Sequence, residues 1–320
     1  MVRLFFACDC HGSEIVWRKM LKASNYYKAN VLLMCGDLTG KAAIPIIKIG
    51  SNKWECMRSA DLTQAEKNME TLRSEEEVKR KMQEFRNMGY YPFETTPEEV
   101  QEISKDERKI NQLINTLMRE TLARWLKMIE KEIAKDVTVV VMPGNDDEYV
   151  IDDIIKENEG VVYPLEKVVQ IDKYEMISCS YVNPTPWQTP RECPEKDLRK
   201  ILEKEFNRVD NYETLICNFH CPPYGTNLDL GPKLDKKWRP ITVAGVPVTE
   251  HVGSKSVREL ILHYQPLLGL HGHIHESCGF ERLGRTLCLN PGSEYQIGVL
   301  RGYVIDLHPN GKINFQRVEM

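Results

Sequence analysis

Short apolar runs recur along the chain, and each ends abruptly at or next to Gly, Asp or His. Their apolar residues are continuous rather than alternating, which is typical of strands that are buried on both faces. We therefore predict five core strands, at Val2–Cys8, Val31–Cys35, Val137–Met142, Leu215–Phe219 and Pro266–Leu270.

Helical periodicity lies between several of these runs. We expect helices at Ser13–Ala23, Asp147–Glu157 and Ser254–His263, with Ser13 and Ser254 as N-caps. Later runs at Val168–Tyr181, Thr286–Leu289 and Tyr303–Leu307 look like strands with hairpin connections, and Pro309-Asn310-Gly311 is a clear hairpin signal. This mixture predicts an α/β sandwich in which part of the sheet is antiparallel.

The stretch from Lys53 to Asp136 has a different pattern. It is rich in Glu, Lys, Arg, Met and Gln, and its apolar residues recur with helical spacing, as in Leu122-Trp125-Leu126-Ile129. Gly89–Pro92 and Pro97 break this periodicity. We expect one domain over residues 1–320, with residues 53–136 as a helical insertion in it. Two interpretations of the insertion stay open, a solvated appendage and a lid over an active site.

Composition narrows the class of protein. The 320 residues are 42% hydrophobic and 28% charged, as in an ordinary globular protein. The net charge of -4 argues against a broad nucleic-acid surface. No stretch approaches the roughly 20 apolar residues that a membrane span needs. The ten cysteines lack zinc-ribbon spacing, and several lie in apolar runs. We therefore expect free thiols, no membrane association and a cytoplasmic location.

Five short motifs, rich in metal-binding residue types, follow apolar runs in order. Each alone is weak, since Gly-Asp is usually a turn and a lone strand His is usually structural. Loops at strand ends converge at one edge of a sheet, however, so the ordered set predicts a common site. The motifs are Asp9-Cys10-His11, Gly36-Asp37, Gly144-Asn145-Asp146-Asp147, His220 and Gly272-His273-Ile274-His275.

The spacing within the motifs suggests how they would bind metal. In an extended chain residues i and i+2 point the same way, so Asp9 and His11 can hold one ion together. His273 and His275 can present two imidazoles to the same site. Carboxylate, imidazole and amide oxygen suit Mn²⁺, Fe or Zn²⁺ better than Ca²⁺. Two ions about 3.5–4 Å apart need a shared ligand, and Asp37 is the best placed residue for that role.

The pattern D-x-H, G-D, G-N-x-D, H and G-H-x-H resembles the signature of the calcineurin-like metallophosphoesterases. The resemblance spans Asp9 to His275 and leaves the insertion unmatched. It implies a four-layer α/β/β/α sandwich with the site at the strand ends. It also implies two groups of metal ligands, Asp9, His11, Asp37 and His275 for one ion, and Asp37, Asn145, His220 and His273 for the other.

Further segments resemble the small stand-alone branch that is likened to cyclic-nucleotide phosphodiesterases. These are His220–Thr226, His251–Ser254 and Asn290–Ser293. Serine/threonine protein phosphatases carry an arginine after the second motif and a G-N-H-E third motif, so they are disfavoured. Asp146 stands where many relatives have a His, which removes the usual proton donor to the leaving group. Asn145 is expected near the phosphate, and we place both Asn145 and Asp146 among the candidate catalytic residues.

These observations predict a metal-dependent hydrolase that cleaves phosphate esters with a water activated by a binuclear centre. A phosphodiesterase is favoured over a phosphomonoesterase. The cofactors are two divalent ions, Mn, Fe, Zn or Ni, with Mn favoured, and the substrate is a small phosphate ester, with nucleotides among the candidates. A nuclease of the same fold and a catalytically weak metal-binding scaffold are the alternatives. The natural substrate and the oligomeric state stay open.

Three residues near the motifs are expected to play lesser roles. His271 has the same two-residue phase as His273 and His275, but no motif makes it a ligand, so we expect it to be packed or to support a ligand. For Glu276 and Ser293, solvated loop positions are favoured over roles at the edge of the site.

Overall fold

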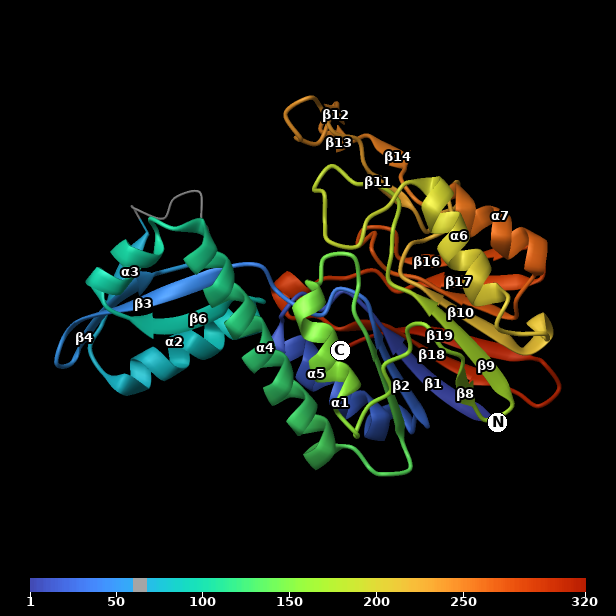
Figure 1. Cartoon of the computed structure of the whole chain (residues 1–320), viewed down its shortest axis with the longest axis horizontal. Coiled ribbons are helices and arrows are strands. Elements are labelled where there is room, and N and C mark those ends of the chain that lie inside the picture. Colours follow the sequence, from blue (N-terminus) through green and yellow to red (C-terminus); the bar gives the residue numbers. More distant parts are fainter. Residues whose placement is uncertain (60–67) are drawn as a thin grey trace.

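The computed structural model describes residues 1–59 and 68–320. A five-stranded sheet forms one half of the body (Figure 1). Within it β1, β2 and β7 are parallel, and β18 runs antiparallel to β1. Its order is β19 (Ile313–Glu319), β18 (Arg301–Leu307), β1 (Val2–Ala7), β2 (Val31–Cys35) and β7 (Thr138–Met142).

A six-stranded sheet forms the other half. Its four central strands are parallel, and the two edge strands are antiparallel to their neighbours. The five predicted core strands are all present, with bounds that differ from the prediction by two residues at most. The order is β16 (Gly279–Leu283), β17 (Thr286–Asn290), β15 (Leu268–Leu270), β10 (Leu215–Phe219), β9 (Tyr174–Cys179) and β8 (Val169–Ile171).

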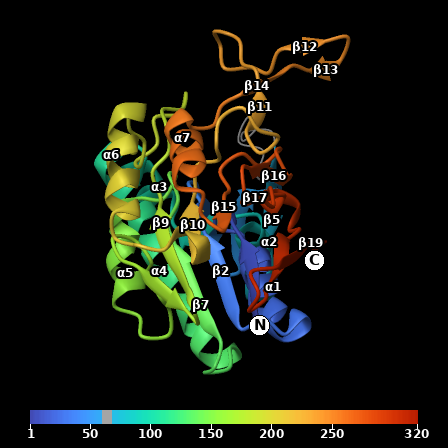
Figure 2. The same cartoon turned by 90° about the vertical axis from the view of Figure 1, so that its right-hand side faces the viewer.

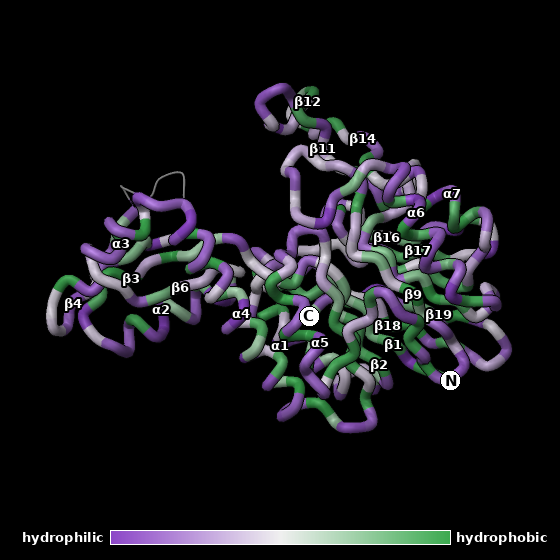
Figure 3. The backbone as a smooth tube through the Cα atoms, viewed as in Figure 1, coloured by the Kyte–Doolittle hydropathy of each residue, from purple (hydrophilic) through white to green (hydrophobic). Residues whose placement is uncertain are grey.

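Strand β1 explains why the core strands read as continuous apolar runs. Phe5 packs in a cluster with α1 (Glu14–Tyr27) and α4 (Glu107–Glu132), whereas its neighbours Leu4 and Phe6 pack against strands of the six-stranded sheet. A third apolar cluster lies between that sheet and the helices α6 (Glu195–Phe206) and α7 (Lys255–Tyr264). The coloured tube in Figure 3 shows these apolar strands surrounded by hydrophilic segments. A mixed α/β fold is therefore confirmed.

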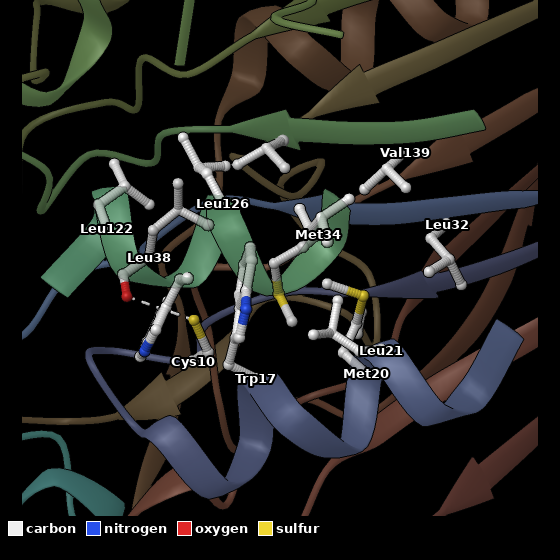
Figure 4. Packing of buried hydrophobic residues seen from close by; sticks show 14 of the residues in the cluster. Cys10, Trp17, Met20, Leu21, Leu32, Met34, Leu38, Leu122, Leu126 and Val139 are labelled. Carbon is white, nitrogen blue, oxygen red and sulfur yellow. Dashed lines mark hydrogen bonds between the residues drawn. The ribbon is translucent and has the colours of Figure 1, made fainter. Parts of the chain in front are cut away.

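The helix α4 belongs to the body although it lies within the predicted insertion. Its Trp125 stacks on Trp17 of α1, with ring centroids 4.8 Å apart. Leu122 and Leu126 reach the same cluster, as Figure 4 shows, where Cys10 also donates to the carbonyl of Leu38. The helical periodicity predicted here is confirmed, and it covers one face of the five-stranded sheet.

The rest of the inserted region is not purely helical, in contrast to our expectation. Together with β3, which precedes residue 53, its described residues form a lobe with a four-stranded sheet and two helices (Figure 1). Trp54 and Cys56 of β4 are buried there together with Leu72 of β5, but these strands are too short to stand out against the surrounding charged residues. Residues 60–67 of the predicted insertion lie outside the described residues. The elements are β3 (Ala43–Gly50), β4 (Lys53–Met57), β5 (Met69–Leu72), α2 (Glu75–Asn87), β6 (Tyr91–Thr95) and α3 (Pro97–Ile103).

The predicted helix ends have mixed outcomes. Ser254 caps α7, because its Oγ accepts a hydrogen bond from the N–H of Val257 at 3.1 Å. Ser13 occupies the predicted N-cap position of α1, but its side chain makes no capping bond, and its hydroxyl donates to the carbonyl of Asn87 at 2.6 Å. The helix expected at Asp147–Glu157 is shorter and divides into a 3₁₀ turn, η2 (Tyr149–Ile151), and α5 (Asp152–Lys156).

Two further predictions concern turns and thiols. β18 and β19 form the antiparallel hairpin that Pro309-Asn310-Gly311 predicted. All ten cysteines are free. In the described part of the chain, no helix is both long and apolar enough to cross a membrane.

A thin arm projects from the body between β10 and α7. It contains two short antiparallel pairs, and Figure 2 shows its tip standing clear of both sheets. The pairs are β11 (Leu230–Pro232) with β14 (Thr249–His251), and β12 (Thr242–Val243) with β13 (Val246–Pro247).

Candidate metal centre

The carboxyl ends of five parallel strands carry the predicted ligands. Asp9 and Asp37 follow β1 and β2, and Asn145 follows β7 in the same sheet. His220 follows β10, and the two histidines of the last motif follow β15. Six of the seven predicted ligands form two groups that could each hold a metal ion, with ligand atoms within 4.8 Å of one another. The groups are Asp9, His11, Asp37 and His275, and Asp37, His220 and His273, so that Asp37 belongs to both.

The spacing of the donor atoms fits metal binding. His11 Nε2 lies 3.0 Å from His275 Nε2, and His220 Nε2 lies 3.3 Å from Asp37 Oδ2. Donors that share one ion through bonds of 2.0–2.2 Å at right angles lie about 3.0 Å apart. The seventh predicted ligand joins the second group, because Asn145 Oδ1 is 3.1 Å from His220 Nε2. The donors present therefore fit divalent ions, in two overlapping positions.

Burial and mutual proximity perturb the pKa values of the cluster. For Asp37, burial and nearby carboxylates raise the pKa to about 6 despite His220. Burial opposes the charged form of His220, but Asp37 and Asp9 outweigh it and raise its pKa to about 9. Burial and His220 lower the pKa of His273 to about 3. Burial opposes ionisation of Asp9 as well, but contacts with His275 and His220 lower its pKa. Such a buried set of carboxylates and imidazoles is typical of a functional site.

The backbone at the site is held in an uncommon conformation. Asp9, His11, Asp37 and His273 all have positive φ, at 56°, 40°, 47° and 69°. Non-glycine residues rarely adopt this region, and when they do they cluster at functional sites. Four predicted ligands with this geometry are an argument for function that is independent of their side-chain chemistry.

Two motif glycines leave the space that the ligand side chains occupy. A Cβ atom on Gly36 would lie 1.9 Å from Nδ1 of His220, and one on Gly144 would lie 2.2 Å from Oδ1 of Asp37. Any larger residue would displace these ligands. The glycines of the G-D and G-N motifs are therefore required by close packing of one motif against another.

Asp147 holds two of the motif loops together, a role that our sequence reasoning missed. Its buried carboxylate accepts hydrogen bonds from the N–H groups of Leu38, Thr39 and Gly144, at 2.7–2.9 Å, and from the Thr39 hydroxyl. The buried Arg191 supports the same loop, since its Nε donates to the carbonyl of Asp147. The position of Asp147 in the motif Gly144–Asp147 was the signal that could have identified it.

Polar residues in and near the last motif hold the backbone of three motifs. Asn290 Nδ2 donates to the carbonyls of Gly272 and Ile274. Ser293 Oγ donates to the carbonyl of Asp9 at 2.6 Å, so Ser293 is not the solvated loop residue that we expected. His271 Nδ1 lies 2.9 and 3.0 Å from the carbonyls of Phe219 and Cys221. His271 thus holds the backbone on both sides of His220, in line with a supporting role.

Asp146 lies at the edge of the centre in an ion pair that the sequence did not reveal. Its Oδ1 is 2.6 Å from Nζ of Lys41, and its Oδ2 is 3.7 Å from Nδ1 of His11. Its N–H donates to Asp37 Oδ1 at 2.9 Å. The aromatic ring of Tyr295 covers His11 from another direction, with centroids 4.7 Å apart. Lys41 and Tyr295 are therefore neighbours of the centre that our predictions omitted.

The inserted region contacts the same loops directly. The hydroxyl oxygen of Tyr91, at the start of β6, accepts a hydrogen bond from the N–H of Gly40 at 2.8 Å. Asn87, at the end of α2, accepts the bond from Ser13 described above. The insertion is thus anchored beside the first two motifs.

Comparison with known proteins gives one curated relative. No protein-family model matches the chain. Over 173 residues the chain is 32% identical to the uncharacterized protein MJ1162 of Methanocaldococcus jannaschii. The aligned region covers 52% of this chain and 71% of the relative. The chain belongs to the family of MJ1162.

Two solved structures resemble this chain in fold. TT1561 of Thermus thermophilus aligns over 98% of both chains with a TM-score of 0.53 and 13% identity. Another crystal structure aligns over 98% of both chains with a TM-score of 0.57 and 16% identity. At this identity the two likenesses show the fold alone. An archaeal phosphodiesterase aligns over the full length with 13% identity, but its TM-score of 0.34 is too low to indicate a shared fold.

Proposed function

We propose that this protein is a metal-dependent phosphoesterase with two ions, and that it favours phosphodiesters. The observation that carries the proposal is the pair of buried Asp and His groups that share Asp37. We further propose that the two sheets and their outer helices are the four-layer α/β/β/α sandwich of the calcineurin-like metallophosphoesterases. The ordered motifs support this assignment, since each lies at the carboxyl end of a strand.

The predicted ligands would be shared between the two ions. Asp9, His11 and His275 would hold one ion, His220, His273 and Asn145 the other, and Asp37 both. When bound, such ions lower the pKa of a water towards about 7 and stabilise negative charge on the phosphate oxygens. The chain itself fixes the positions of the donors through strained backbone and the bonds of Asp147, so little rearrangement is needed during the reaction.

Asp146 is a poor proton donor in this arrangement. Its carboxylate lies 2.6 Å from Lys41 and is engaged in this ion pair, so in our proposal it does not act as the acid for a leaving alkoxide. General acid catalysis is typically worth about 10²–10⁴-fold, and esters with a stable aryl leaving group need it least. We infer that aryl diesters are hydrolysed faster than alkyl monoesters, with Asp146 orienting Lys41 beside the substrate.

The insertion forms part of the wall of the proposed active site. Tyr91 and Asn87 bind the loops of the first two motifs, which supports a fixed position rather than a freely solvated appendage. We propose that residues 53–136 shape access to the ions from this side.

Hydrolysis of bis(p-nitrophenyl) phosphate tests the proposed function. The protein loaded with Mn²⁺ should hydrolyse it, and Asp37→Asn should reduce kcat/KM by more than about 100-fold, because even residues that only orient a ligand contribute 10–100-fold. Asp172→Asn is the matched control, since Asp172 is exposed in the turn between β8 and β9, at the edge of the sheet away from the site. Full activity of Asp37→Asn would contradict the proposal.

A further inference from the structure

The loop between β9 and α6 forms a rim beside the candidate metal centre. The Thr189 hydroxyl accepts a hydrogen bond from Asn145 Nδ2 at 2.8 Å, and the N–H of Arg191 donates to the Asn145 carbonyl at 3.2 Å. The side-chain oxygen of Asn145 in turn lies 3.1 Å from His220 Nε2. This loop, residues 182–192, therefore contacts the side of the centre where Asn145 and His220 meet.

Hydrogen bonds hold the rim loop in one conformation. The Glu192 carboxylate accepts bonds from the N–H groups of Thr185 and Thr189, both at 2.8 Å, and from both threonine hydroxyls. At the base of the loop, the N–H of Val182 donates to the Arg191 carbonyl, and the N–H of Cys193 donates to the Val182 carbonyl. Three prolines restrict the backbone further, at positions 184, 186 and 190.

Trp187 stands at the tip of this rim loop. Its backbone N–H donates to Thr185 Oγ1 at 3.1 Å, which fixes the backbone, yet 67% of the residue is exposed. Isolated exposed apolar residues are common and need no explanation. Trp187 differs because it is a large flat ring on a fixed loop, two residues from Thr189, which touches a predicted ligand. Fixing an aromatic ring before binding reduces the entropy lost when a ligand stacks on it.

We propose that Trp187 is a stacking platform for a planar ring in the organic part of the substrate, and that the substrate is a phosphate ester carrying a nucleobase. The proposal rests on the proposed phosphoesterase function and adds the residue that selects the ester. Every base has a flat face, and stacking of a base on an aromatic side chain is worth about 1–3 kcal/mol. The sugar would span the distance between the ring on Trp187 and the phosphate at the ions.

Two esters with the same leaving group test this proposal. Thymidine 5′-(p-nitrophenyl phosphate) and methyl p-nitrophenyl phosphate both release p-nitrophenol, so they differ only in the group that Trp187 would bind. Trp187→Ala should raise KM about tenfold for the thymidine ester, as loss of a stacked base predicts, and change it less than about twofold for the methyl ester. Trp187→Phe, which keeps a ring, should restore part of the affinity.

Control variants separate this role from other effects. Tyr26→Ala removes an equally exposed aromatic residue (73%) at the far end of α1 and should change neither KM. An equal change on both esters, or no change on either, would overturn the proposal. A change in molecular mass by light scattering in Trp187→Ala with both KM values kept would also overturn it, since Trp187 would then contact a second copy of the chain.

Direct binding keeps the test independent of catalysis. If the wild-type protein hydrolysed neither ester, the phosphoesterase proposal would fail, and calorimetry with AMP and Mn²⁺-loaded protein would still test the platform. We expect AMP to bind the wild type and to bind Trp187→Ala about tenfold more weakly. Equal affinities, or no binding to the wild type, would overturn the role of Trp187.

Discussion

The body and the lobe of β3 to β6 are both built from strands and helices, but they bury their strands differently. In β1 the consecutive residues Leu4, Phe5 and Phe6 are all fully buried, since apolar layers cover both faces. In β4, by contrast, Lys53 is exposed and Glu55 is only half-buried, while Trp54 and Cys56 pack into a small cluster of the lobe. The strand ends of the body are covered on both sides and therefore provide a dry place for charged ligands. The lobe has no such place in its described residues and contributes contacts to the site instead.

Removal of the insertion should have the largest effect. Replacing residues 53–136 with a short linker deletes α4, and with it five buried side chains from the main core, among them Trp125. We expect the variant to lose cooperative unfolding and all hydrolytic activity, as measured by calorimetry and by assays on a small aryl ester and a bulky ester. Retained hydrolysis of the small ester would instead mean that the whole segment is a dispensable lid.

A matched pair of substitutions separates the two regions. Trp125 and Trp54 are both buried, one in the body and one in the lobe. Each change to Ala should cost about 3–5 kcal/mol of local stability. Trp125→Ala should lower the main unfolding transition, whereas Trp54→Ala should open the lobe to limited proteolysis and leave Mn²⁺ binding intact. Similar loss of Mn²⁺ binding in both variants would show that the two regions unfold as one unit.

Asp146 allows a smaller and more specific change at the edge of the site. Asp146→His supplies a group that can donate a proton, so turnover of an alkyl phosphate should rise by about 10²-fold, while turnover of an aryl ester changes little. Asp146→Asn is the control, since it also breaks the ion pair with Lys41 but adds no acid. Equal effects of the two variants on the alkyl ester would assign the change to Lys41 rather than to proton transfer.

Glu14 joins the two regions, and its substitution should have the smallest effect. Burial opposes its charge, but Arg124 on α4 and Arg18 outweigh this and lower its pKa, and Gln83 on α2 donates to it as well. Because the folded pKa is lower than the unfolded value of about 4.3, the stabilisation is complete at pH 7 and is lost as the pH falls through the folded pKa. Glu14→Gln should cost about 1–2 kcal/mol at neutral pH.

Thermal unfolding of the metal-free proteins measures this contribution. The difference in Tm between wild type and Glu14→Gln should be clear at pH 7 and should shrink towards zero in acid. A difference that stays constant with pH would mean that the variant loses packing rather than the charge of Glu14.

The sequence was most informative where burial on both faces or close packing restricts the residue type. The core strands were recognised because layers cover both of their faces, and the ligand types were recognised because they follow these strands. Asp147 and Asn290 both lie in segments that the sequence analysis singled out, but their roles were missed because they bind backbone groups rather than side chains. The N-cap position of Ser13 was predicted, but the partner of its hydroxyl was not, since Asn87 lies 74 residues away. Strands of the lobe such as β4 and β5 were missed because each spans only a few residues among charged ones.

In the proposed centre, Asp37 lies between two metal ions. Crystals grown with Mn²⁺ and measured at the manganese absorption edge would show each ion as a separate anomalous peak. We expect two peaks about 3.5–4 Å apart, one near His11 and His275 and the other near His220 and His273, with Asp37 in contact with both. A single peak, or peaks that Asp37 does not touch, would contradict the proposed two-metal centre.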